Sequence, residues 1–116
     1  MSEVKITVGG DIEAEAGRRF VDAWHRAQSG KRFRERHLVF ENWDALARIL
    51  TGKRMELLRY VRRHPVNSVR ALAKALGRDY SNVHADVQAL MAAGLLDALG
   101  GGVRADYDAI ETRIAI

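Results

Sequence analysis

The first forty residues alternate between apolar and polar side chains, change to a helical period, and then alternate again. Residues 3–8 have the period-2 pattern of a half-buried strand. The apolar face of this strand consists of Val4, Ile6 and Val8. Residues 12–28 have the period of an amphipathic helix. Its apolar positions at steps of four are Ala16, Phe20 and Trp24. A second short strand is predicted over about 35–40, after Phe33.

A short helix is predicted next, over residues 43–50. Asn42 precedes it and is a favourable N-cap residue. Apolar side chains recur within it at i, i+3, i+4 and i+7, the spacing of one helix face. We expect the following residues on that face to be buried: Trp43, Leu46, Ala47 and Leu50.

Three further helices are predicted in close succession, over 52–63, over 69–76 and from residue 80 to about 93. Their expected caps are Thr51, then Asn67 or Ser68, and Asp79. Their expected stops are His64-Pro65, Gly77 and Gly94. Their inward-facing residues are Met55, Leu58, Val61, Val69, Leu72, Ala73, Leu76, Val83, Val87 and Leu90.

The residues after Gly94 predict two short strands joined by the turn Gly100–Gly102, and a last strand over 109–116. The first and last strands each have one apolar face, so we expect them to pair with each other or across a dimer. The predicted fold class is α+β: a winged helix-turn-helix with a three-helix core and a short β-wing, preceded by a strand-helix-strand extension. The predicted domains are residues 1–40 for the extension and 41–116 for the winged helix-turn-helix.

The net charge of +4 is unevenly distributed along the chain. Residues 31–63 contain ten Lys and Arg against four Asp and Glu, whereas residues 1–30 and 64–116 each have a net charge of −1. A basic block attracts polyanions and releases counterions from phosphate. The alternative is a solvated basic face that keeps the chain in solution.

The helix that starts at residue 80 has a small polar face opposite its apolar one. A 3.6-residue period places Ser81, His84, Ala85 and Gln88 together on the outward side. Gln can bond an adenine edge, His and Ser can bond bases or phosphates, and Ala can approach a thymine methyl group. This pattern predicts a major-groove recognition helix. The alternative is a surface helix of a small bundle.

Further contacts to DNA phosphates are expected around this helix. Tyr80 and Asn82 lie in its first turn, where the helix N-terminus favours an anion. The cationic residues expected to clamp phosphates are Lys53, Arg54, Lys74 and Arg78.

The segment "LTGKRMELLRYVRRHP…SVRALAKALGRDYSNVHADVQALMAAGLL", preceded by "FENWDALARI", resembles a family of winged helix-turn-helix DNA-binding regulators of bacteria and archaea. The resemblance covers about residues 38–116, and "LGRDYSNVHADVQAL" is its most specific stretch. Members are often encoded beside a small toxin gene as antitoxins. The resemblance therefore implies a transcriptional regulator, with DNA contacts at Tyr80, Ser81, Asn82, His84 and Gln88.

The sequence argues against several other classes of protein. It has no cysteine, so thiol chemistry and the common structural zinc sites are excluded, and we expect neither a metal nor a cofactor. None of the four histidines has a partner at a spacing suited to catalysis or metal binding, so we expect no enzyme. We find no signal peptide and no apolar stretch near the roughly 18 residues of a membrane span, and expect a cytoplasmic protein.

The aromatic residues of the extension, Phe20, Trp24 and Phe33, are expected to form a dimer or partner contact. The expected partners are double-stranded DNA, a second copy of the chain, and a co-encoded toxin that the protein would neutralise while repressing its own operon. RNA is a less favourable target, because a helix cannot read the deep, narrow groove of an RNA duplex. The alternative function is a protein-interaction module that neutralises a toxin and has little DNA role.

Overall fold

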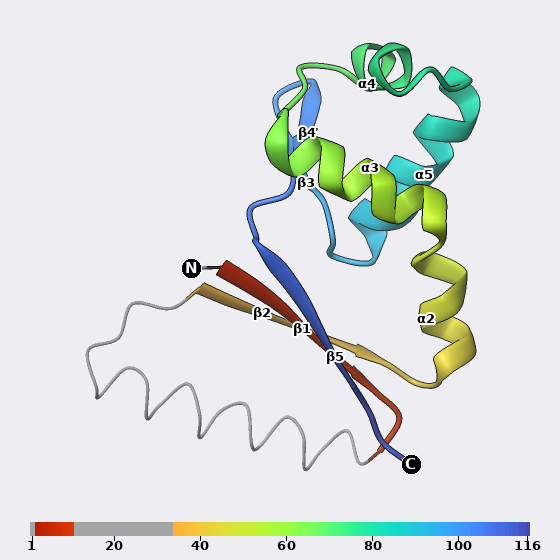
Figure 1. The fold of residues 1–116 in the computed structure, drawn as a ribbon, viewed down its shortest axis with the longest axis vertical. Helices are drawn as coiled ribbons and strands as arrows, with labels where there is room; N and C mark the ends of the chain where they lie inside the picture. The colour runs from red at the N-terminus through yellow and green to blue at the C-terminus, as the bar shows by residue number, and fades with distance from the viewer. Residues whose placement is uncertain (1, 11–33) are drawn as a thin grey trace. The chain divides into compact units, whose positions relative to one another are not determined.

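The computed structural model describes residues 2–10 and 34–116, which form an α+β fold (Figure 1). Its elements in chain order are β1 (Ser2–Val8), β2 (Arg34–Phe40), α2 (Trp43–Ile49), α3 (Gly52–Arg63), α4 (Val69–Leu76), α5 (Tyr80–Ala92), β3 (Asp97–Leu99), β4 (Gly102–Arg104) and β5 (Ala109–Ile114). The helix predicted over 12–28, with Phe20 and Trp24, lies outside the described residues, and so does Phe33.

The chain divides into two compact units. One unit is Ala47–Asp106, and the other combines Met1–Leu46 with Tyr107–Ile116. The predicted domain boundary at residue 40 stays a prediction, and residues 107–116 lie in the same unit as β1. The reason is strand pairing, because β5 pairs with β1 from the other end of the chain.

A three-stranded sheet with the order β2-β1-β5 forms the unit that contains both ends of the chain. Both pairings are parallel. The predicted strand over 3–8 is confirmed, and its apolar face is buried: Val4, Ile6 and Val8 are 0%, 1% and 2% exposed. Pairing between the first and last strands, one of two expected arrangements, is also observed.

Ion pairs connect the strands on the opposite face of this sheet. The Lys5 ammonium lies 3.5 Å from the Glu35 carboxylate of β2 and 3.8 Å from the Glu111 carboxylate of β5. His37 Nε2 lies 3.0 Å from the second oxygen of Glu35, whose side chain is only 6% exposed. Because Glu35 is largely withdrawn from water, its two basic neighbours compensate for the loss of hydration.

The predicted burial of helix α2 is largely wrong. Leu46 is buried, but Trp43 is 54% exposed and Ala47 is also exposed. The helix ends at Ile49, so Leu50 lies between two helices and is only half-buried. A stripe at i, i+3, i+4 and i+7 requires two full turns against one surface, which this seven-residue helix does not provide.

The bounds predicted for α3, α4 and α5 are confirmed to within a residue or so. Each helix begins at an expected cap, because the side chains of Thr51, Ser68 and Asp79 accept hydrogen bonds from backbone N–H groups of the first turn. The core residues of these helices are Leu57, Leu58, Val61, Leu72, Ala73, Val83, Val87 and Leu90. Leu57 was not predicted, whereas Met55, Val69 and Leu76 are only half-buried.

The predicted hairpin after α5 is also confirmed. Strands β3 and β4 pair antiparallel across Gly100 and Gly101. Val103 of β4 bridges to Val66, which lies between α3 and α4, and its N–H donates to the Val66 carbonyl oxygen at 3.2 Å. Gly102 is required here, because a Cβ atom would lie 2.7 Å from the Val66 carbonyl carbon and closer still to its oxygen. This contact anchors the hairpin to the helices.

Candidate nucleic-acid interface

Helices α4 and α5 are joined by a tight turn of defined geometry. Helix α4 ends at Gly77, which adopts the left-handed conformation with φ 64° and ψ 34°. The Arg78 N–H donates to the Ala73 carbonyl oxygen at 3.0 Å, and the Gly77 N–H donates to that of Lys74 at 3.2 Å. These bonds form a Schellman motif, which satisfies the last carbonyls of α4. Asp79 then caps α5, so only three residues separate the two helices.

Helix α5 has the two faces that the sequence predicted. Val83, Val87 and Leu90 are 0% exposed and hold the helix against its unit. All predicted DNA-contacting residues of the helix are exposed: Tyr80, Ser81, Asn82, His84, Ala85 and Gln88. The helix therefore presents a polar surface with no aliphatic side chain larger than Ala, which suits contact with base edges.

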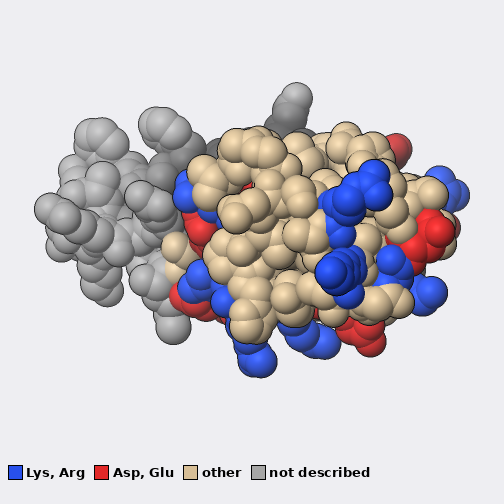
Figure 2. Space-filling view, turned by 90° about the horizontal axis from the view of Figure 1, so that it is seen from above, with Lys and Arg blue, Asp and Glu red and all other residues tan. Residues whose placement is uncertain are grey.

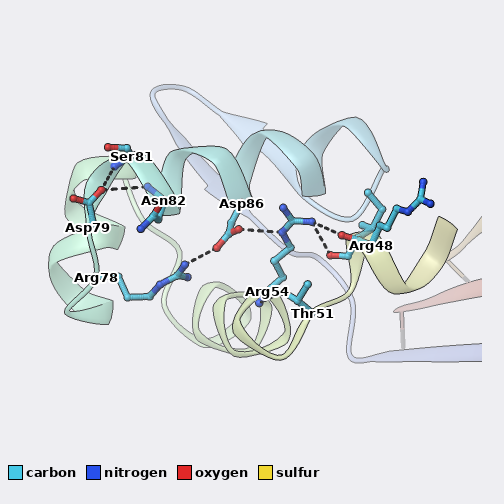
Figure 3. A network of polar contacts seen from close by, with 9 residues as sticks. Arg48, Thr51, Arg54, Arg78, Asp79, Ser81, Asn82 and Asp86 are labelled. Carbon is cyan, nitrogen blue, oxygen red and sulfur yellow. Dashed lines mark hydrogen bonds and ion pairs between the residues drawn. The ribbon is translucent and has the colours of Figure 1, made fainter. Parts of the chain in front are cut away.

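The N-terminus of α5 is already occupied by an anion of the chain itself. Asp79 Oδ1 accepts hydrogen bonds from the N–H groups of Ser81 at 2.8 Å and Asn82 at 3.3 Å (Figure 3). Bonds from the Ser81 side chain and from these two N–H groups hold the pKa of Asp79 below its usual value. The expected phosphate contact at this terminus is therefore disfavoured, because the phosphate would face the Asp79 carboxylate.

A second acidic residue, Asp86, connects α5 to two arginines (Figure 3). Arg78 Nη2 donates to Asp86 Oδ2 at 2.7 Å, and Arg54 Nε donates to Asp86 Oδ1 at 3.0 Å. The three side chains are only 14–20% exposed. Partial burial would raise the pKa of Asp86, but the hydrogen bonds and charges of Arg78 and Arg54 outweigh it and lower that pKa below its usual value.

Arg54 also closes the end of helix α2. Its Nη1 donates to the carbonyl oxygens of Arg48 at 2.9 Å and Ile49 at 3.1 Å. Arg54 and Arg78 were predicted to clamp phosphates, but the structure uses both guanidinium groups to hold α5 in place. Both arginines are therefore positioning residues for the exposed face of α5, and sequence reasoning had missed Asp86 as their common partner.

The other two predicted clamps, Lys53 and Lys74, are exposed. The structure adds Arg70 of α4, which sequence reasoning missed. Its guanidinium carbon lies 4.6 Å from the centre of the Tyr80 ring, and that ring lies 5.7 Å from the ring of His84. Arg70 thus brings a positive charge to the exposed polar face of α5 by a cation–π contact. Arg70 lies two residues before the buried Leu72 and therefore on the outer side of α4, and this spacing in the sequence could have indicated its exposure.

The unit that carries these helices is basic. Ala47–Asp106 contains ten Lys and Arg against five Asp and Glu, a net charge of +5, whereas the remaining residues carry −1. In Figure 2, Lys and Arg side chains stand among a larger uncharged surface, and acidic side chains lie toward its margins. The helical unit therefore carries the charge needed to attract a polyanion.

Residues 2–10 and 34–116 contain no group of three or more His, Asp or Glu side chains that could hold a metal ion. No helix in these same ranges is long and apolar enough to span a membrane.

The fold and this surface together define a small α+β protein with an exposed polar helix after a tight turn. A family model described as HVO_A0114 matches residues 49–112, more than half of the chain, and the chain therefore belongs to the HVO_A0114 family. The comparison with curated proteins gave no match, and the comparison with solved structures gave none.

Proposed function

We propose that Ala47–Asp106 is a winged helix-turn-helix that binds double-stranded DNA and that the protein is a transcriptional regulator. The observation that carries this proposal is the exposed polar face of α5, which follows a three-residue turn and is backed by three fully buried residues. Helix-turn-helix proteins place the second helix of such a pair in the major groove. The hairpin β3–β4, which follows α5 and is anchored at Val66, supports the proposal as a candidate wing.

The charges of the unit support the same proposal. The exposed cations Lys53, Arg70 and Lys74 can contact phosphates, whereas Arg54 and Arg78 are paired with Asp86 of α5. Affinity would therefore come from α3 and α4, and base selection from α5. A regulator of this kind would act in the cytoplasm, where the DNA is. Its function would require neither catalysis nor a cofactor.

The test is selection of binding sites from random double-stranded DNA, followed by affinity measurements on the selected site. His84→Ala and Gln88→Ala should each reduce discrimination between the selected site and random DNA by about 1–3 kcal/mol. His64→Ala is the matched control, since His64 is also exposed but lies at the end of α3. Unchanged affinity and selectivity in a His84→Ala, Gln88→Ala double variant would reject α5 as the recognition helix.

The finer roles expected from the resemblance are parts of this proposal. An antitoxin that represses its own operon should bind the DNA upstream of its own gene and should form a complex with the adjacent gene's product. Mobility-shift assays with that DNA and co-expression with that product test the two roles separately. A homodimer is also proposed, because one module of this size contacts too few base pairs to be selective.

A further inference from the structure

Strand β5 lies at an edge of the three-stranded sheet and has an exposed outer side. Within residues 2–10 and 34–116, β5 pairs only with β1, and its residues are exposed except for Ile110, which is half-buried. Ile114 is 46% exposed. Such an edge presents backbone N–H and C=O groups that can pair with another strand.

The pairing with β1 determines which backbone groups face outward. The Ala115 N–H donates to the Val8 carbonyl oxygen at 3.0 Å, toward β1. Backbone groups of a parallel strand alternate between its two sides, so Glu111 and Arg113 also direct theirs toward β1. Ile110, Thr112 and Ile114 therefore direct their N–H and C=O groups to the outer edge.

We propose that two copies of the chain associate through this edge, with β5 paired antiparallel to β5 of the second copy around a twofold axis at Thr112. In this register, the two Thr112 residues exchange backbone hydrogen bonds. Ile110 of each copy does the same with Ile114 of the other. All outward-facing backbone groups of these residues are then paired, as an antiparallel ladder requires.

Side chains select this register over its neighbours. It places Glu111 of each copy opposite Arg113 of the other, so two opposite-charge pairs form on the polar face of the sheet. An axis at Glu111 would oppose two Glu111 residues, and an axis at Arg113 would oppose two Arg113 residues. Directly opposed like charges are unfavourable in a sheet.

The apolar face is continuous in the same arrangement. Ile110 lies beside Val4 of β1 and Ile114 lies beside Val8. Antiparallel neighbours share a face, so these isoleucines would extend the apolar rows of β1 into the second copy. The result is one continuous sheet with the strand order β2-β1-β5 in one copy followed by β5-β1-β2 in the other. Strand β5 is then no longer an edge strand.

This inference specifies the interface for the homodimer of the proposed function. Its test is carried out without DNA, so that a failure here is distinguishable from a failure of DNA binding. Sedimentation equilibrium of the full chain should give twice the 13.0 kDa mass of one chain. A monomer at all concentrations up to about 100 µM, where a contact of biological strength is populated, would overturn the inference.

Charge reversal tests the register. Glu111→Arg opposes two arginines and Arg113→Glu opposes two glutamates, so each variant alone should be largely monomeric. An equimolar mixture of the two should form a heterodimer, because each copy then meets its opposite charge. Dimers of either single variant as stable as the wild type, or no association in the mixture, would overturn the proposed register.

A backbone substitution provides an independent test. The Thr112 N–H faces the outer edge, so Thr112→Pro removes a bond of the interface and none of the bonds to β1. This variant should be monomeric, with circular dichroism of the wild type. Thr112→Val keeps the N–H and is the matched control, which should remain dimeric. A Thr112→Pro dimer would show that the contact uses another surface and would overturn the inference.

Discussion

Asp86 of α5 and Arg78 of the preceding turn form a hydrogen-bonded ion pair, with 2.7 Å between Oδ2 and Nη2. The pair spans the turn between α4 and α5 and leaves Arg78 with 20% of its side chain exposed. The ion pair therefore holds α5, the proposed recognition helix, in a fixed position relative to the turn that precedes it.

Asp86→Asn should destabilise the protein by about 1–3 kcal/mol, because it leaves two partly buried guanidinium groups without their counter-charge. Urea unfolding followed by circular dichroism measures the change. Asp106→Asn is the matched control: its ion pair with Arg104 has a similar length of 2.9 Å, but both side chains are 40% or more exposed. That substitution should change the stability by less than about 0.5 kcal/mol.

The stability should fall in acid in a way that depends on Asp86. The pKa of Asp86 is lower in the folded chain than its usual value. Its contribution is therefore complete above the unfolded-state pKa of about 3.9 and is lost as the pH falls through the lower folded pKa. The difference in free energy of unfolding between wild type and Asp86→Asn should be constant from pH 7 to about 5 and should shrink below pH 4. A difference that grows in acid would contradict the ion pair.

Gly102→Ala should be strongly destabilising, by about 2–4 kcal/mol, because the added methyl group meets the Val66 carbonyl. The expected result is separation of β4 from Val66, seen as a lower midpoint of thermal unfolding. Gly52→Ala is the comparison, since nothing lies within 4 Å of a Cβ atom there. It lies in a helix and should stabilise the chain slightly. Equal effects at the two glycines would contradict the anchoring of the hairpin.

Lys53→Gln and Lys74→Gln should weaken binding to all DNA sequences alike. Each should reduce the slope of log affinity against log salt by about 1, as expected for a lost phosphate contact. Lys5→Gln is the matched control, because it removes the same charge from the other unit. If Lys5→Gln reduced the slope as much as the other two substitutions, net charge alone would explain the effect.

Local signals in the sequence predicted the helices well. Caps and stops lie within a few residues of the helix ends they determine, and Thr51, Ser68, Asp79 and Gly77 all act as expected. Contacts between distant residues were not predictable in this way. Arg54 and Asp86 are 32 residues apart, so nothing near Arg54 in the sequence indicates that its charge is already paired.

In the candidate site, too, local features were predictable from the sequence and contacts between distant residues were not. Periodicity alone identified the exposed face of α5, because three apolar residues on one side leave the polar ones on the other. The pairing of Arg54 and Arg78 with Asp86 could not be predicted in this way, because it depends on a side chain from another helix. Trp43 was expected to be buried because it belongs to the apolar stripe of its helix, but only Leu46 of that short helix reaches a buried position.

The central strand of the sheet has a consequence for the order of events during synthesis. Strand β1 is translated first and β5 is translated last, yet β1 lies between β2 and β5. At about 5–20 residues per second, β1 waits about 5–20 s on the ribosome for its last neighbour. Residues 47–106 are translated in that interval. Until β5 is available, one edge of β1 lacks its partner strand, and the nascent chain is then most exposed to unwanted strand pairing.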